Sequence, residues 1–304
     1  MRYLMFVIPL VLAACGGGET RTLPRGETLS VIATTPALAS MALAIAGDDA
    51  KVELFGPEGG SSHDFEPSVN DRRRLETAHV LLVNGMGLEG FDTLKVAKSA
   101  RILHVNCSAD MPKEYLIGSI ETEDEHAGHD HAHGEHNPHV WLGTEGAIHQ
   151  ARAITEALAK ADPAHADGYR SRFEALKSRL EALVAEYKPK VAALTKKNFV
   201  SNHDAFPYFA REFGLKQVGV IQRTPGHNPT VEQRRAIEKM LSSGHAHAIF
   251  MEPGYDDAAS RIIAENSKLP LGVLDPFDVG KPSTDGLEKV MRANLDTVLK
   301  TLGR

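Results

Sequence analysis

The sequence predicts an α/β protein with two lobes, each a mostly parallel sheet with flanking helices, joined by a long helical connector. Short β-rich runs alternate with helical stretches from residue 29 onward, and the same alternation restarts near residue 199. Such alternation is typical of parallel sheets covered by helices. Between the two series, residues 163–194 carry apolar side chains at helical spacings of three and four. The length of 304 residues also suggests about two domains.

The N-terminal lobe, placed at 28–162, contains the first series of elements. Its expected strands are 29–34, 52–55, 80–83 and 100–106, and its expected helices are 37–47, 68–78, 88–97 and 144–161. The first helix should end at Gly47, because glycine tolerates the backbone conformations that close a helix. The segment 121–137 interrupts the series and is rich in His, Gly, Asp and Glu with almost no apolar residues, which indicates a mobile loop.

The connector is placed at 163–194, with Pro163 in a first helical turn, where proline is tolerated. Pro189 lacks a backbone N–H and predicts a kink or break near Lys188. The C-terminal lobe follows at 195–304, with expected strands at 199–201, 216–221, 248–251 and 271–275 and helices at 205–214, 230–244, 257–267 and 285–302. Thr230 and Gln233 have the spacing of a capping box.

The N-terminus has the pattern of an export signal. Arg2 precedes a short apolar run at 4–12, which is too short to span a bilayer, and Cys15 follows small residues. We interpret 1–14 as a signal peptide, Cys15 as a lipidated cysteine and 15–27 as a tether. An ordinary secretory signal with an incidental cysteine is the alternative. Cys107 is then the remaining cysteine, so neither an intramolecular disulfide nor a cysteine-based zinc site is expected.

Four polar residues fall at or after expected strand ends, two from each lobe: His63, His139, His203 and Asp275. Ligands of such sheets bind beyond the carboxyl ends of the strands. If the four side chains meet across a cleft, three imidazoles and one carboxylate form a natural tetrahedral set for Zn²⁺.

Other interpretations of these residues stay open at this stage. Asp275 precedes a proline and could be a turn residue. Glu252 could accept an imidazole N–H or be a solvated loop carboxylate. Trp141 is expected to be a packing residue near His139. The formal charge of −6 gives no support to a nucleic-acid partner, which would need a basic patch.

These motifs resemble the zinc-type metal-binding lipoproteins of ABC importers, the cluster A-I or family 9 substrate-binding proteins. The resemblance rests on the segment before Cys15, "GPEGGSSHDFEPS", "NPHVWL", "VSNHDAFPYFAREFGL" and "VLDPF", in that order. It implies two lobes bridged by one rigid helix, a metal held between them, an importer permease as partner, a membrane anchor through lipid, and a monomer that is not an enzyme. Manganese-type members tend to carry Glu at the position of His203, and Ser62 stands where some zinc-type members have Glu.

The resemblance assigns His139 to the metal site and leaves an auxiliary loop. The loop histidines are His126, His129, His131, His133 and His136. We expect any ion bound there to be held weakly, because ordering a loop costs conformational entropy. A solvated low-complexity linker is the alternative.

The expected function is an exported receptor, periplasmic or membrane-anchored, that captures Zn²⁺ and delivers it to a permease. Two other functions are considered. An exported zinc hydrolase would keep one coordination position open for water, and no H-E-x-x-H motif is present. A zinc-buffering or adhesive surface lipoprotein would have the His-rich loop as its main feature.

Overall fold

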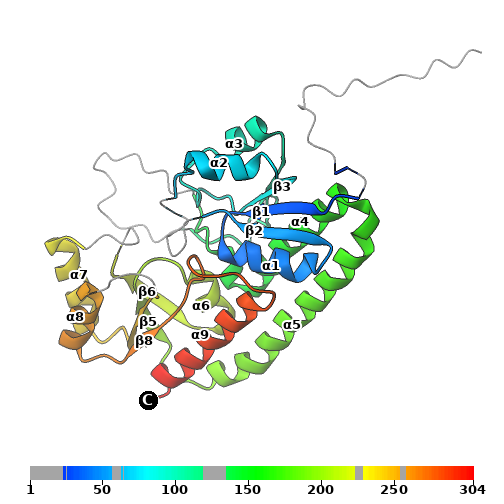
Figure 1. Cartoon of the computed structure of the whole chain (residues 1–304). Helices are drawn as coiled ribbons and strands as arrows, with labels where there is room; N and C mark the ends of the chain where they lie inside the picture. Colours follow the sequence, from blue (N-terminus) through cyan, green and yellow to red (C-terminus); the bar gives the residue numbers. More distant parts are fainter. Residues whose placement is uncertain are drawn as a thin grey trace, which may run out of the picture.

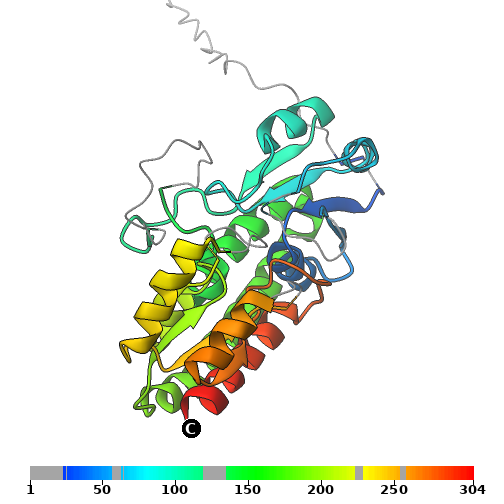
Figure 2. The same cartoon turned by 90° about the vertical axis from the view of Figure 1, so that its left-hand side faces the viewer.

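The computed structural model describes residues 23–24, 26–56, 63, 65–118, 135–222, 229–253 and 258–304. Two separate sheets account for its strands, and both consist of parallel pairs. The predicted α/β class with two mostly parallel sheets is therefore confirmed. Figures 1 and 2 show the N-terminal sheet and its helices above the C-terminal sheet and its helices.

The first sheet has the strand order β2-β1-β3-β4. Its strands are β1 (Leu29–Ala33), β2 (Ala50–Leu54), β3 (Val80–Val83) and β4 (Leu103–Asn106), and its connecting helices are α1 (Pro36–Ala46), α2 (Val69–Leu75) and α3 (Thr93–Ala100). Thr35 caps α1 by accepting a hydrogen bond from the Leu38 amide, and Gly47 ends it as predicted. The α3 helix begins later than predicted because Asp92 caps it through the Lys95 amide.

The second sheet repeats this pattern with the order β6-β5-β7-β8. Its strands are β5 (Asn198–Ser201), β6 (Lys216–Val220), β7 (Ala248–Met251) and β8 (Leu271–Val273), and its connecting helices are α6 (Pro207–Phe213), α7 (Val231–Ser242) and α8 (Ala258–Ser267). The predicted capping box of Thr230 and Gln233 is present at α7. Gly214 closes α6 in the left-handed conformation, where glycine avoids the steric cost of a side chain.

Long helices join the two sheets. The α4 helix (Thr144–Ala161) follows the short helix η1 (Val140–Leu142), and η2 (Pro163–His165) leads into α5 (Ala166–Ala192), which runs past both sheets in Figure 1. The last helix, α9 (Gly286–Leu302), packs against α5 and α1. One buried apolar cluster includes Leu38 of α1, Leu180 of α5 and Leu295 of α9, so the connector shares a core with both units.

Of the kink or break predicted near Lys188, a break does not occur, since α5 continues through Pro189 to Ala192. Pro189 lies in the last turn, where the loss of its N–H removes a single hydrogen bond. Tyr187 and Val191, on either side of it, are both buried in the core and hold this turn in place.

The strand order places several polar residues at one edge of each sheet. In the N-terminal unit, β2 leads toward His63. In the C-terminal unit, β5 leads to His203 and β7 directly to Glu252. Because all strands of a sheet run parallel, their carboxyl ends lie at a common edge. The fold thus brings segments from both units to one place.

Candidate metal centre

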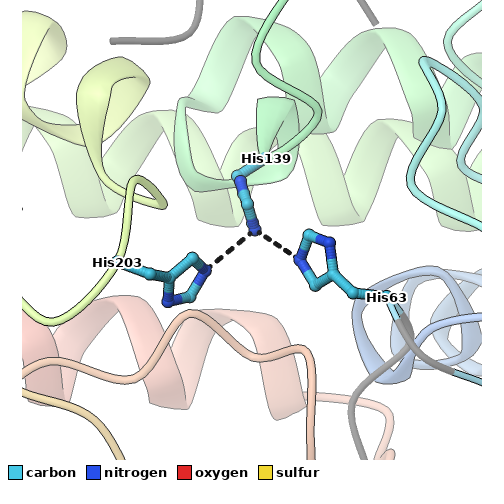
Figure 3. Close-up of side chains that lie close together, drawn as sticks. All are labelled: His63, His139 and His203. Carbon is cyan, nitrogen blue, oxygen red and sulfur yellow. Dashed lines mark hydrogen bonds between the residues drawn. The ribbon is translucent and has the colours of Figure 1, made fainter. Parts of the chain in front are cut away.

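Three imidazoles from separate parts of the chain converge on one point. The Nε2 atom of His139 lies 3.2 Å from Nε2 of His63 and 3.3 Å from Nε2 of His203 (Figure 3). One nitrogen from each ring lies within 4.8 Å of the other two. A tetrahedral ion that holds nitrogens at about 2.0–2.1 Å would separate them by roughly 3.3–3.4 Å. The spacing of His139 from its two neighbours therefore matches that of ligands sharing an ion.

His139 is buried, and its ring orientation is set by Asn137. The Asn137 side-chain oxygen accepts a hydrogen bond from the His139 backbone N–H at 3.0 Å and lies 3.1 Å from Nδ1 of the ring. Its amide nitrogen donates to the carbonyl of Asp204 at 2.6 Å, which fixes which end of the amide faces the histidine. Nδ1 of His139 must then donate, and the neutral ring keeps a lone pair on Nε2.

His203 is oriented by Glu252 in the same manner. One carboxylate oxygen of Glu252 lies 2.5 Å from Nδ1 of His203, and the other accepts from the His203 backbone N–H at 3.0 Å. Glu252 is buried, so the structure decides for the imidazole acceptor and against a solvated loop carboxylate. An acceptor on Nδ1 fixes the tautomer and raises the basicity of Nε2, as is usual for metal-ligating histidines.

His63 is half-buried and stands on the segment between β2 and α2. A β-carbon built on Gly90 would lie 2.8 Å from the His63 carbonyl oxygen, closer than real contacts allow. The absence of a side chain at Gly90 therefore lets the two loops approach. Its neighbour Glu89 accepts hydrogen bonds from the Asn84 and Gly85 amides, and the Asn84 side chain donates to the carbonyl of Pro138. The hydrogen bonds of Glu89 and Asn84 were not predicted, because no sequence spacing indicates them.

The two buried histidines have opposite pKa shifts. Burial, and then the imidazoles of His203 and His63, hold the pKa of His139 well below its usual range. Burial also acts to lower the pKa of His203, but the charge and hydrogen bond of Glu252, with Asp278 and Asp204, raise that pKa overall. His139 is thus ready to bind a cation at neutral pH, whereas His203 must exchange a proton for it over part of the pH range.

Asp275 does not join this group of ligand atoms. Among the described residues, the group of candidate metal ligands contains His63, His139 and His203 without Asp275. The Asp275 carboxylate instead accepts the Phe277 backbone N–H at 2.8 Å, which is the turn role that aspartate before proline favours. Burial raises the pKa of Asp275, which the Phe277 hydrogen bond partly offsets.

Asp278, three residues after Asp275, is one of the carboxylates whose charge acts on His203, after Glu252. It is 1% exposed, and it contributes to the raised pKa of His203. Phe277 before it has a φ of +57°, which is strained for a bulky side chain and redirects the chain at this point. Both aspartates stand in the motif "DPFD", and only Asp275, at the expected strand end, was considered from the sequence.

Among the other predicted site residues, the structure describes only His136 and Trp141. His136 is half-buried and is not a member of the group. His126, His129, His131, His133 and Cys15 lie outside the described residues. Trp141 is fully buried with its ring centroid 5.2 Å from that of His139, so its predicted packing role is confirmed. Across the described parts of the chain, no helix combines the length and apolar composition needed to cross a membrane.

Comparison with known proteins supports this interpretation of the fold. A family model described as zinc-uptake complex component A, periplasmic, matches residues 31–301. A protein described as metal-binding from Treponema pallidum is 30% identical over 297 residues, covering 96% of this chain and 92% of the relative. The iron ABC transporter substrate-binding lipoprotein MtsA of Streptococcus pyogenes serotype M1 is 26% identical, with coverage of 98% and 96%.

Among solved structures, the substrate-binding protein FpvC of Pseudomonas aeruginosa, in complex with Mn²⁺, superposes with a TM-score of 0.79 at 28% identity. The match covers 91% of this chain and 99% of FpvC. Fold and site thus define a metal-binding substrate-binding protein of an ABC importer, which is not an enzyme. More narrowly, the chain belongs to the family of zinc-uptake complex component A, which confirms the resemblance seen in its motifs.

The role of Glu252 can be tested in the metal-free protein. In Glu252→Gln the charge that raises the pKa of His203 is lost while the burial remains, so this pKa should fall below that of the unmodified chain. A raised histidine pKa stabilises the fold below the unfolded value of about 6.5 and ceases to do so as pH rises through the folded value. Histidine-selective NMR titration measures the pKa.

Chemical unfolding at pH 6 and pH 9 checks the same linkage. The stability advantage of the unmodified protein over Glu252→Gln should shrink at the higher pH. Asp167→Asn is the matched control, since that carboxylate is fully exposed. An unchanged His203 pKa in Glu252→Gln would contradict the assigned role.

Proposed function

We propose that the protein captures Zn²⁺ outside the cytoplasm with His63, His139 and His203 and delivers it to an importer permease. The observation that carries the proposal is the pair of buried imidazoles, His139 and His203, whose Nδ1 atoms face oxygen acceptors while their Nε2 atoms face each other at 3.3 Å. Two neutral rings held in this way direct lone pairs at the same space, and a cation between them relieves the repulsion.

The choice of Zn²⁺ follows from the donor set. Imidazole nitrogens suit the later first-row metals, whereas Mn²⁺ favours oxygen ligands and binds such sites more weakly. The family name supports zinc, although the relatives include proteins named for iron and a structure with Mn²⁺. Cu²⁺ would bind at least as well by intrinsic affinity, so its exclusion depends on availability.

For the oxygen ligand, we propose Asp278 in place of the Asp275 that the sequence suggested. Neither carboxylate belongs to the group of three imidazoles in the described structure, but Asp278 is buried and its charge contributes to the raised pKa of His203, while the Asp275 carboxylate is engaged by the Phe277 amide. A fourth protein ligand would close the coordination sphere, which suits capture and transport and leaves no position for a reactive water.

Export and anchoring complete the proposal. Removal of residues 1–14 would leave Cys15 as the lipid-bearing end of a tether that extends to residue 27, and the chain would work as a monomer. The relatives named as lipoproteins support this arrangement. The histidines of the segment 121–137, His136 among them, would hold a second ion weakly.

Replacement of His203 by alanine is the direct test of the function. Removal of a residue that only hydrogen-bonds to a metal ligand lowers metal affinity about 10- to 100-fold. The mature His203→Ala protein should lose more Zn²⁺ affinity than that, because it lacks the ligand itself. Metal content after purification and titration against a competing chelator measure the loss. His245→Ala is the control, because that imidazole is exposed and hydrogen-bonds to Ser243. Retention of tight binding in His203→Ala would favour a zinc buffer centred on the His-rich segment.

The two aspartates are separated by a matched pair of variants. Asp278→Asn should weaken Zn²⁺ binding strongly, whereas Asp275→Asn should leave the affinity within about threefold, because an amide oxygen still accepts the Phe277 N–H. Isothermal titration of both proteins decides between them. Equal losses, or a larger loss in Asp275→Asn, would return the ligand role to Asp275.

Affinity should fall with pH because bound imidazoles must be unprotonated. The raised pKa of His203 means that its proton competes with the metal first as pH decreases, and His139 follows only at much lower pH. Zn²⁺ titrations from pH 8 to pH 5 in two buffers of different ionisation enthalpy measure both affinity and proton release. Identical affinities at pH 5 and pH 7.5 would refute histidine ligation.

A further inference from the structure

Tyr208 contacts both Ile117, which precedes the His-rich segment 121–137, and Asn137, the last residue of that segment. The Ile117 backbone N–H donates to the Tyr208 hydroxyl oxygen at 3.1 Å, and the hydroxyl donates to the Asn137 carbonyl at 3.0 Å. The Asn137 backbone N–H completes this set of contacts by donating to the Ile117 carbonyl at 2.8 Å. The Tyr208 hydroxyl, on α6 of the C-terminal unit, therefore connects the backbones of Ile117 and Asn137, which belong to the N-terminal unit.

Asn137 carries this junction to the metal centre in one step. Its side-chain oxygen orients the His139 imidazole, and its amide nitrogen donates to the carbonyl of Asp204, the residue after His203. A shift of Asn137 would thus move His139 and loosen the contact with the His203 loop together. Tyr208 holds the backbone of Asn137, and the Asn137 side chain contacts both the His139 ring and the backbone next to His203.

The hydroxyl is the part of Tyr208 on which this arrangement depends. The ring is held independently by stacking on Tyr115, with centroids 5.2 Å apart and planes at 22°, and by the Arg211 guanidinium, which lies over both rings. Tyr208 is 1% exposed, so loss of its oxygen would leave the buried Asn137 carbonyl and the partly buried Ile117 amide without this partner. A phenylalanine would keep the ring packing and remove only the hydrogen bonds.

We propose that Tyr208 is a positioning residue for metal retention: its hydroxyl joins the backbones of Ile117 and Asn137 and, through Asn137, holds His139 in place against the His203 loop. This inference rests on the proposed function, because it concerns how long the metal stays at the three histidines. It assigns to a residue of the C-terminal unit the placement of a ligand from the N-terminal unit. Release of the metal would then accompany opening of this junction.

The test compares Tyr208→Phe with Tyr115→Phe in the mature protein. In Tyr208→Phe we expect Zn²⁺ to dissociate about 3- to 10-fold faster and the dissociation constant to rise by a similar factor, as the loss of one or two buried hydrogen bonds allows. Tyr115→Phe should change both by less than about twofold, since its hydroxyl makes none of the contacts above. Stopped-flow transfer of Zn²⁺ to a chelator measures the rate.

A double-mutant cycle separates positioning from general stability. In an Asn137→Ala background, Tyr208→Phe should add little further loss, because the connection to His139 is already cut. Histidine-selective NMR should also show the His139 Nδ1–H exchanging faster in Tyr208→Phe. Full additivity of the two changes, or a lower melting temperature of the metal-free Tyr208→Phe protein with unchanged Zn²⁺ dissociation, would overturn the inference.

The outcome is distinguishable from failure of the proposed function. If the unmodified protein does not bind Zn²⁺, or if His203→Ala binds it normally, the metal site itself is at fault. If His203→Ala loses binding while Tyr208→Phe retains the dissociation rate of the unmodified protein, only the role of Tyr208 is wrong. Should Tyr208→Phe fail to fold, Asn137→Ala alone must still accelerate dissociation for the inference to hold.

Discussion

The metal centre depends on oxygen acceptors that hold the Nδ1 side of two buried imidazoles. Asn137 faces Nδ1 of His139 and Glu252 faces Nδ1 of His203, so both rings present Nε2 to the same space. Turning either ring would bury an unpaired polar nitrogen, and the low polarity of the surroundings makes this costly. In the proposed metal site these two side chains are therefore already oriented, so that binding would not have to order them.

The two parallel sheets supply the scaffold for this arrangement. In the C-terminal sheet β5 leads to His203 and the neighbouring β7 leads to Glu252, so the carboxyl ends of these two strands bring imidazole and acceptor together. Contacts between the units hold the histidines of one against those of the other. The Trp141 indole N–H donates to the Pro276 carbonyl at 2.7 Å, and the Ser283 backbone N–H donates to the Ser40 hydroxyl oxygen at 3.2 Å. A continuous α5 that shares its core with both units favours modest motion between them.

Sequence patterns were sufficient for the elements and for part of the site. Alternating β-rich and helical stretches predicted both sheets, and glycine and capping residues predicted helix ends such as Gly47 and Thr230. Of the two outcomes predicted from Pro189, a kink or a break near Lys188, the break does not occur, because local rules do not weigh the burial of Tyr187 and Val191 against one lost hydrogen bond. Asp278 was not considered from the sequence, because a sequence does not show that the chain turns at Phe277.

By itself the sequence determined the α/β class, the residue types available for metal binding and the three histidines that the structure brings together, since strand ends and donor chemistry can be recognised locally. Only the tertiary structure decided the tautomers of His139 and His203, the turn role of Asp275 and the junction at Tyr208. These depend on contacts between residues far apart in the chain, such as the 71 positions between Asn137 and Tyr208. Their distances and directions follow from how the two sheets pack, which no local pattern contains.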